Sequence, residues 1–252
     1  MFILGLETSG QPGSVAILDE QGVLAHSSYE QPGMHAEHLL DHVEAAIRSV
    51  GCERHHLGKI AVGIGPGNFT GLRVGIALAS GIGLGLNIGV VGVCSLASMA
   101  SAIVAPELDV RFIVRDARRG EVFCAAFTKR GDALIAPTLV GTNNLFEWLG
   151  SKSGALATRS GVRSALAGDG LQWLSVQEKK ELGAYIPDGA ELLWPDARQT
   201  ALIGLRLQTS QTIAPDYVRD ADAKMPNLTL NPLLNAEGPW GVSPNVNKVT
   251  PS

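Results

Sequence analysis

Cysteine is scarce in this chain of 252 residues, and its three copies are scattered. Cys52, Cys94 and Cys124 form no CxxC pair, and their number is odd. Disulfide frameworks use cysteines in even numbers, and structural zinc sites use closely spaced pairs, so the pattern argues against both. We expect three small, buried hydrophobic side chains in a reducing compartment, which predicts a cytoplasmic protein.

A surplus of basic residues is also missing. The chain has 20 lysines and arginines against 24 acidic residues, a net charge of -4. Tight binding to a nucleic-acid backbone depends on clustered lysine and arginine. We therefore expect this chain to meet RNA indirectly, through other proteins.

Targeting and membrane signals are weak. The apolar stretch 2–6 begins at once, without a basic segment before it, so we expect no signal peptide. Residues 74–93 carry no charge, but they are rich in glycine and include Asn87. A spanning helix needs about 20 mostly apolar residues with anchors at its ends. We predict a buried helix, a glycine turn and a buried strand in this region instead of a membrane span.

Catalytic and metal-binding motifs are not recognisable. We find no Ser-His-Asp arrangement with supporting context, no reactive-cysteine setting and no general base paired to a metal. His35, His38 and His42 have a spacing that places them on neighbouring turns of one helix. No HExxH pattern or acidic cluster completes a metal site around them, so we predict surface histidines. The chain is expected to have no catalytic residue and no metal site.

What is present is a repeated order of elements. Apolar periodicity predicts strands at 2–7, 14–18 and 23–29, a helix at 35–50, a strand at 59–64, a helix from 69, a strand at 89–93 and a helix at 96–104. The second half repeats this order with strands at 111–115, 121–127 and 134–140, a helix around 145–149, a strand at 164–167, a helix at 171–182, a strand at 184–186 and a helix at 197–208. The order predicts a duplicated actin-like, sugar-kinase-like (ribonuclease H-like) two-lobed α/β fold.

Three regions follow from this pattern. Residues 1–105 form the predicted N-terminal lobe and residues 106–224 the C-terminal lobe. In residues 225–252, Asn, Pro, Gly and Ser are frequent and apolar periodicity is lost. We expect a flexible tail or a loosely packed extension there.

The first predicted strand ends at Glu7, and Thr8 and Ser9 follow it, where actin-like phosphotransferases place a phosphate loop. In such loops an acidic residue positions a metal, while hydroxyl and N–H groups hold phosphate. A polar hairpin turn that satisfies its own backbone is the alternative. These residues, with Gly65 and Gly67 of the next loop, are candidates for a vestigial nucleotide site.

The segment 65–73, GPGNFTGLR, is the strongest local motif and joins a predicted strand to a helix. A helix N-terminus can bind an anion. The segment is neither a Walker A loop nor a GxGxxG fingerprint, so we favour a tight turn with close packing. In the second half, the charged turn 116–119 suits either a phosphate, a partner carboxylate or plain solvation, and Asp169 is interpreted as a turn residue.

Small residues recur at every fourth position of the second helix: Gly71, Gly75, Ala79 and Gly83. Such a stripe permits a close helix contact, with either the sheet of the same chain or another subunit. The other faces of this helix are apolar too, which is typical of a helix buried by its own fold or by a partner. If a partner covers the stripe, Gly75→Leu should disrupt pairing.

These motifs together resemble the TsaB (YeaZ) family, the dimerization subunit of the bacterial tRNA threonylcarbamoyladenosine complex. The resemblance covers residues 1–224 and is carried by 6–9 (LETS), 65–73 (GPGNFTGLR), 116–123 (DARRGEVF), 167–170 (AGDG) and 215–219 (PDYVR). Glu7 stands where the family usually has Asp, and Asn68 where it usually has Ser. The tail beyond Lys224 has no recognisable counterpart.

The resemblance implies a non-catalytic subunit that pairs with the larger catalytic homologue TsaD, recruits the small ATPase TsaE and forms a homodimer when alone. The complex places threonylcarbamoyl on the adenosine next to the anticodon, and ATP belongs to the partner subunits, so no cofactor is expected here. Family members pair through N-terminal helices, which makes these residues interface candidates: Leu39, Leu40, Val43, Gly71, Leu72, Arg73, Gly75 and Ile76. The alternative is an independent phosphotransferase or ATPase, which would bind ATP and lose affinity on Thr8→Ala.

Overall fold

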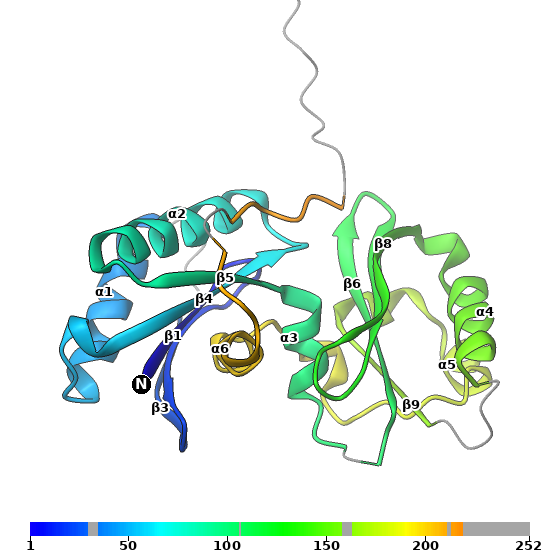
Figure 1. Cartoon of the computed structure of the whole chain (residues 1–252). Helices are drawn as coiled ribbons and strands as arrows, with labels where there is room; N and C mark the ends of the chain where they lie inside the picture. The colour runs from blue at the N-terminus through cyan, green and yellow to red at the C-terminus, as the bar shows by residue number, and fades with distance from the viewer. Residues whose placement is uncertain (30–34, 106, 158–162, 211–212, 219–252) are drawn as a thin grey trace, which may run out of the picture. The chain divides into compact units, whose positions relative to one another are not determined.

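Two sheets, each built from one half of the chain, organise the fold (Figure 1). The first has the order β3-β2-β1-β4-β5, from β1 (Phe2–Glu7), β2 (Gly13–Asp19), β3 (Gly22–Tyr29), β4 (Leu57–Gly65) and β5 (Gly89–Cys94). The second has the order β8-β7-β6-β9, from β6 (Val110–Arg118), β7 (Glu121–Phe127), β8 (Ala133–Gly141) and β9 (Ser164–Ala167). The computed structural model describes residues 1–29, 35–105, 107–157, 163–210 and 213–218, so the predicted tail lies outside the described residues.

The two sheets repeat one pairing scheme. β1 pairs with β2 antiparallel and with β4 parallel, and β6 pairs with β7 antiparallel and with β9 parallel. The predicted duplication of the α/β fold is therefore confirmed. The predicted strand at 184–186 is wrong, since a single parallel bridge, Tyr185 to Ala165, takes its place beside β9. Pro187 follows directly and has no N–H to extend the ladder.

The helices of the first half are α1 (His35–Ser49), α2 (Phe69–Leu86) and α3 (Ser95–Ala102); those of the second half are α4 (Leu145–Ala157), α5 (Val176–Glu181) and α6 (Ala197–Arg206). Short 3-10 turns are η1 (Arg54–His56), η2 (Thr142–Asn144), η3 (Asp169–Trp173) and η4 (Ala190–Leu192). The helix predicted over 171–182 is thus two pieces, η3 and α5. Ser175 separates them because it forms a capping box with Glu178 and starts α5 anew.

The two faces of the first sheet pack against different helices. Leu4 and Leu6 of β1 pack in the hydrophobic cluster under α1 and α2, whereas Ile3 packs in the cluster that includes α6. This alternation follows from the two-residue period of a strand. At the α6 face, side chains at Gly5 and Gly204 would clash with the opposing elements, so both glycines permit close packing.

Helices α3 and α6 contact the sheet of the opposite half. α3 packs against β6 and β7, and α6, predicted to belong to the second lobe, packs against β1, β2 and β4. Lys59 of β4 strengthens the second contact by donating from Nζ to the carbonyl oxygens of Gly204, Leu205 and Leu207 at the end of α6. The lobe boundaries 1–105 and 106–224 stay predictions.

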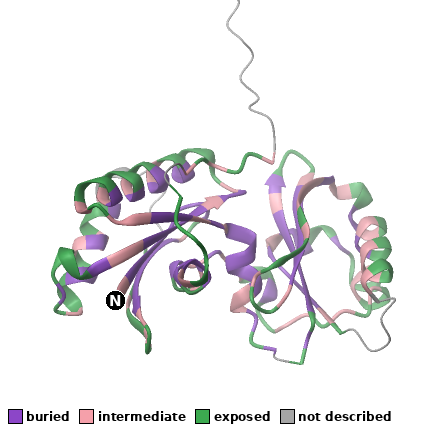
Figure 2. Ribbon diagram, viewed as in Figure 1, coloured by how far each residue is buried: buried purple, intermediate pink, exposed green. Residues whose placement is uncertain are grey.

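Helix α2 is buried on one face and exposed on the other (Figure 2). It is long and apolar enough to cross a membrane by length and composition, and a third of that window is buried. Core helices of soluble proteins meet the same criterion. The helix ends at Asn87, whose left-handed backbone makes the turn into β5, so the turn predicted to depend on glycine is formed by asparagine.

Candidate functional site

The end of β1 carries a buried carboxyl group. Glu7 has no exposed surface, and its Oε1 accepts a hydrogen bond from the Ser9 backbone N–H at 2.9 Å. The Ser95 hydroxyl lies 3.3 Å from each carboxylate oxygen, and the Thr200 hydroxyl donates to Oε2 at 3.2 Å. The turn after β1, helix α3 and helix α6 therefore converge on this one group.

Burial raises the pKa of Glu7 above its ordinary value of 4.5, because desolvation outweighs the hydrogen bonds from Ser9 and the positive charge of Arg115. A side chain at Gly63 on the neighbouring strand would overlap the carboxylate, so this glycine provides its space. The group is enclosed by protein on every side that the structure describes.

The five residues predicted as a vestigial nucleotide site do come together. The loop containing Gly65 and Gly67 lies against the turn after β1, and the Asn68 N–H donates to the Ser9 carbonyl at 2.8 Å. A Cβ at Gly67 would clash with that carbonyl oxygen. Glu7, Thr8 and Ser9 are all fully buried. The residues of the predicted site therefore lie together, but they are buried, and their polar groups face other parts of the chain.

Three neighbours of this loop were not predicted. Ser95 begins α3, Thr200 lies in α6, and Arg115 comes from β6 of the second sheet. Arg115 donates from Nη2 to the Ser9 carbonyl at 3.0 Å and from Nη1 to the Ser9 hydroxyl at 3.4 Å. A signal for Arg115 exists in the sequence, since a charged residue within an apolar strand needs a buried partner. Ser95 and Thr200 carry no comparable signal.

The hydroxyl of Thr8 faces helix α2. A Cβ at Gly75 would clash with it, so the glycine gives Thr8 its room. In the described part of the chain, this buried hydroxyl has no hydrogen-bond partner. Gly71 likewise lies against the Thr8 carbonyl.

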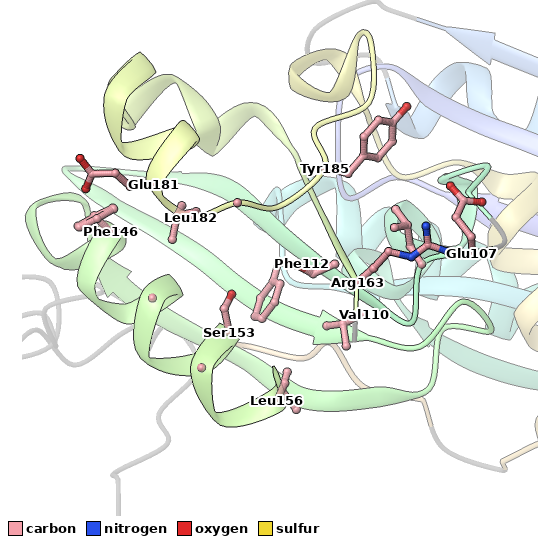
Figure 3. Close-up of a pocket in the computed structure, with 15 residues that line it drawn as sticks. Glu107, Val110, Phe112, Phe146, Ser153, Leu156, Arg163, Glu181, Leu182 and Tyr185 are labelled. Atoms are coloured by element: carbon pink, nitrogen blue, oxygen red, sulfur yellow. The ribbon is translucent and has the colours of Figure 1, made fainter. Parts of the chain in front are cut away.

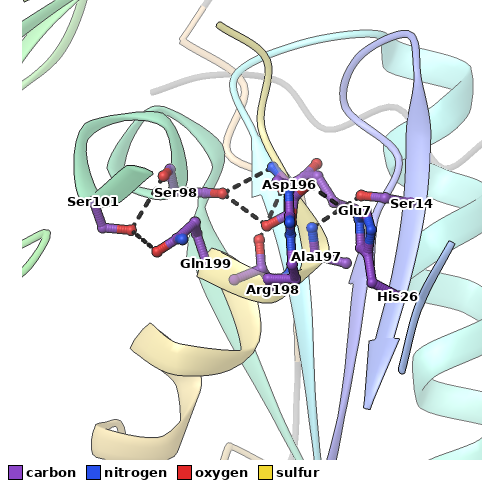
Figure 4. Close-up of polar contacts among 10 residues, drawn as sticks. Glu7, Ser14, His26, Ser98, Ser101, Asp196, Ala197, Arg198 and Gln199 are labelled. Atoms are coloured by element: carbon purple, nitrogen blue, oxygen red, sulfur yellow. Dashed lines mark hydrogen bonds and ion pairs between the residues drawn. The ribbon is translucent and has the colours of Figure 1, made fainter. Parts of the chain in front are cut away.

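The N-terminus of α6 is fixed by a second polar cluster (Figure 4). Asp196 caps the helix by accepting from the Arg198 N–H at 2.8 Å, and His26 Nε2 lies 3.1 Å from its Oδ2. Ser14 accepts from the backbone N–H that follows Asp196, and Ser98 exchanges hydrogen bonds with the Asp196 backbone. Burial alone would raise the pKa of Asp196, yet the bonds from Arg198 and the charge of His26 hold it below its usual value. The cluster positions α6 over the first sheet.

The eight predicted interface residues differ in exposure. Six of the eight residues are buried within this chain: Leu39, Val43, Gly71, Leu72, Gly75 and Ile76. The small-residue stripe faces inward. A side chain at Gly71 or Gly75 would clash with Thr8 in the turn after β1, and a side chain at Gly83 would clash with Val90. Leu40 and Arg73 are exposed. The interface itself stays a prediction.

A different face of α2 points to solvent. Its exposed residues include Arg73, Ala77, Gly81, Leu84 and Gly85. Leu84 is 86% exposed, and a Cβ at Gly81 or Gly85 would meet open space. At the start of this face, Arg73 lies 3.8 Å above the Phe69 ring and donates to the Tyr217 hydroxyl. Sequence periodicity missed this face because nearly every position of the helix is small or apolar.

The remaining candidates have structural partners. His42 lies 3.2 Å from the Ser27 hydroxyl and His38 lies 3.9 Å from Asp41; the side chain of His35 lies outside the described residues. Among the described residues, no group of three potential metal ligands occurs. Asp169 accepts from the Asp116 N–H at 2.8 Å and begins η3, which agrees with a structural interpretation.

All three cysteines are free; Cys52 and Cys124 are buried and Cys94 is half-buried. Burial raises the pKa of Cys94 to about 11 and that of Cys124 to about 12, so neither is a thiolate near neutral pH.

In the turn 116–119, Arg118 and Arg119 both have positive φ, which forms the tight connection from β6 to β7.

The second sheet borders a separate cavity of about 590 Å³ (Figure 3). Val110 and Phe112 of β6 lie on one side, α4 lies on another, and Glu107 and Arg163 lie at one end. None of the predicted site residues lines it. The cavity has the size of a small-molecule site, but its charged groups are exposed at the rim.

Two sheets with one repeated strand order and two helices that cross between the halves define an actin-like, two-lobed α/β protein. Two solved Pseudomonas aeruginosa structures share this fold. One, described as similar to peptidase YEAZ, has a TM-score of 0.69 and 24% identity, covering 86% of this chain and 99% of that chain. The other, YeaZ, has a TM-score of 0.64 and 24% identity, covering 81% and 91%.

The sequence comparisons narrow this class. The family model described as "TsaD: tRNA N6-adenosine threonylcarbamoyltransferase" matches residues 22–166, more than half of the chain. The Escherichia coli tRNA threonylcarbamoyladenosine biosynthesis protein TsaB is 27% identical over 227 residues, which are 86% of this chain and 92% of the relative. The chain belongs to the threonylcarbamoyltransferase family, in its TsaB (YeaZ) group.

Proposed function

We propose that this chain is a non-catalytic pairing subunit of the cytoplasmic machinery that installs threonylcarbamoyl on the adenosine next to the anticodon of tRNA. Relatives named TsaB support a role in tRNA threonylcarbamoyladenosine biosynthesis. The pairing role rests chiefly on one observation, the exposed face of α2. An 18-residue apolar helix with such a face gains stability when another subunit covers it.

The catalytic homologue TsaD is the partner that we propose covers this face. The small side chains of Ala77, Gly81 and Gly85 would let a partner helix approach closely, and Leu84 would anchor it. Leu40 of α1, a helix that contacts α2, is an exposed apolar residue as well. In the absence of TsaD, a second copy of the chain is the proposed occupant. TsaE and tRNA are proposed to join through the assembled complex, since the net charge of -4 gives this chain little attraction for RNA.

We also propose that this chain has no catalytic activity of its own. Glu7, Thr8 and Ser9 are fully buried. Arg115 donates hydrogen bonds to the carbonyl and hydroxyl oxygens of Ser9. Magnesium and a triphosphate would have to displace these contacts. The proposal therefore expects no ATP binding by the isolated chain at millimolar ATP with magnesium, and calorimetric detection of such binding would favour the phosphotransferase alternative.

Association with TsaD from the same organism tests the pairing role. We expect a stable complex in size-exclusion chromatography, weakened about tenfold or more in calorimetry by Leu84→Lys, because a charge would be buried in an apolar contact. Leu192→Lys is the matched control, since Leu192 is 77% exposed but lies on η4. No association of the wild-type chain, or equal weakening by both variants, would contradict the proposal.

A further inference from the structure

One backbone carbonyl joins the second sheet to the start of α2. The Ser9 oxygen accepts from the Asn68 N–H at 2.8 Å and from Arg115 Nη2 at 3.0 Å. Asn68 is the N-cap of α2, and its side chain accepts from the Gly71 N–H at 2.8 Å. A carbonyl oxygen has two lone pairs, so both are used here. The contacts form a continuous chain from β6 to the first turn of α2.

The guanidinium of Arg115 is held firmly in place. The side chain is 6% exposed, and its Cζ lies 5.6 Å from the centre of the Trp194 ring. The carboxyl groups of Glu7 and Asp169 interact with its charge. A Cβ at Gly10 would lie 2.9 Å from Arg115 Nη2, so the glycine permits the turn to approach. These contacts suit a fixed structural cation and leave little freedom for a mobile side chain.

The loop before α2 has equally little freedom to move. Gly67 packs so closely on the Ser9 carbonyl that a Cβ there would clash. A shift of Ser9 would therefore displace Gly67 and Asn68, and with them the beginning of α2. Removing Arg115 would leave the Ser9 carbonyl and hydroxyl short of a donor and the buried Glu7 without its nearby cation.

From this geometry we infer that Arg115 is a latch through which the second sheet sets the position of the α2 N-terminus, and thereby the presentation of the partner-binding face. The second part of this inference rests on the proposed function. The latch itself does not, because it concerns contacts within one chain.

The experiment compares two buried arginines of β6. Arg115→Met removes the latch, and Arg111→Met is its control. Arg111 is 3% exposed and lies on the same strand, but it donates to the Ile103 and Ala105 carbonyls at the end of α3. Hydrogen exchange of the Asn68 and Gly71 amides in the full chain is measured first. We expect Arg115→Met to speed it about tenfold, as the loss of a charge-assisted hydrogen bond predicts, with no change in Arg111→Met.

Affinity for TsaD is measured next, and we expect a roughly tenfold loss in Arg115→Met alone. Unchanged exchange in Arg115→Met, or an equal change in both variants, overturns the latch. Faster exchange with unaltered affinity overturns its control of the partner face. If wild-type chain does not bind TsaD, the proposed function fails while the exchange result still decides the latch. Should Arg115→Met not fold, Arg115→Gln is interpreted by the same criteria.

Discussion

The surroundings of the Thr8 hydroxyl distinguish a phosphate-binding loop from a structural turn. A phosphate loop would use such a hydroxyl to bind its ligand, whereas here it lies buried against Gly75. Burying a hydroxyl without a hydrogen bond costs about 1–3 kcal/mol. The group therefore destabilises the fold unless a ligand reaches it.

We expect Thr8→Val to leave the free energy of unfolding unchanged or to raise it by about 1 kcal/mol, because valine keeps the shape and removes the hydroxyl. Urea denaturation measures the effect. Thr200→Val is the control, since its equally buried hydroxyl donates to Glu7; it should destabilise by roughly 1–2 kcal/mol. Equal destabilisation by both variants would contradict this assignment.

Glu7 makes stability depend on pH. Its pKa is raised in the folded chain, so the folded state holds the proton to a higher pH than the unfolded state does. The stabilisation is fully present below the ordinary value of 4.5 and is lost as pH rises through the raised pKa. Glu7→Gln keeps the shape and cannot ionise.

The difference in unfolding free energy between Glu7→Gln and wild type should therefore shift in favour of glutamine as pH rises from 4.5, by at most about 1.4 kcal/mol per pH unit. Above the raised pKa the difference should be constant. Urea denaturation from pH 4 to 8 follows it. A difference that does not vary with pH would show that Glu7 titrates normally.

At the scale of the element, α2 carries two stripes of small residues, one that faces inward and one that faces solvent. The inner stripe, which includes Gly75, accommodates the turn after β1. The outer stripe, which includes Gly81, meets open space. The earlier expectation that Gly75→Leu tests pairing is therefore replaced.

Gly75→Leu should lower the free energy of unfolding by about 3 kcal/mol or more, because its side chain would overlap Thr8. Gly81→Leu should leave stability equal or raise it by about 0.5–1 kcal/mol, since leucine is the better helix former, and should weaken pairing. Thermal denaturation and sizing with TsaD separate the two effects. A folded Gly75→Leu chain of normal stability would contradict the inward packing.

The elements themselves were largely predictable from the sequence, and their contacts were not. Alternation in β1 and β2 and the periodicity of α1 depend on nearby residues. The pairings of Ser9 with Arg115 and of Glu7 with Thr200 span 106 and 193 positions, and no local pattern encodes them. The orientation of α2 was missed for a different reason. A helix that is apolar on all sides has no periodic contrast to show which face is buried.

At the scale of the whole molecule, the crossing of α3 and α6 makes the halves interdependent. A fragment of residues 1–105 would lack α6 and expose the face of the first sheet that contains Ile3 and Ala61. We expect this fragment to show no cooperative unfolding transition in circular dichroism.

A chain of residues 1–218 should unfold with the Tm of the full chain, because the compact unit that holds both sheets ends at Arg219. It serves as the control for the fragment. Cooperative unfolding of 1–105 would show that the first sheet does not need α6.

The crossing of α6 also has a consequence for synthesis. Roughly a hundred residues separate the end of β5 from the start of α6, so at about 5–20 residues per second the ribosome needs on the order of 5–20 s to make them. During that interval the apolar face of the first sheet that α6 later covers stays exposed. Chaperones that shield nascent chains would therefore act on this protein before its last helix emerges.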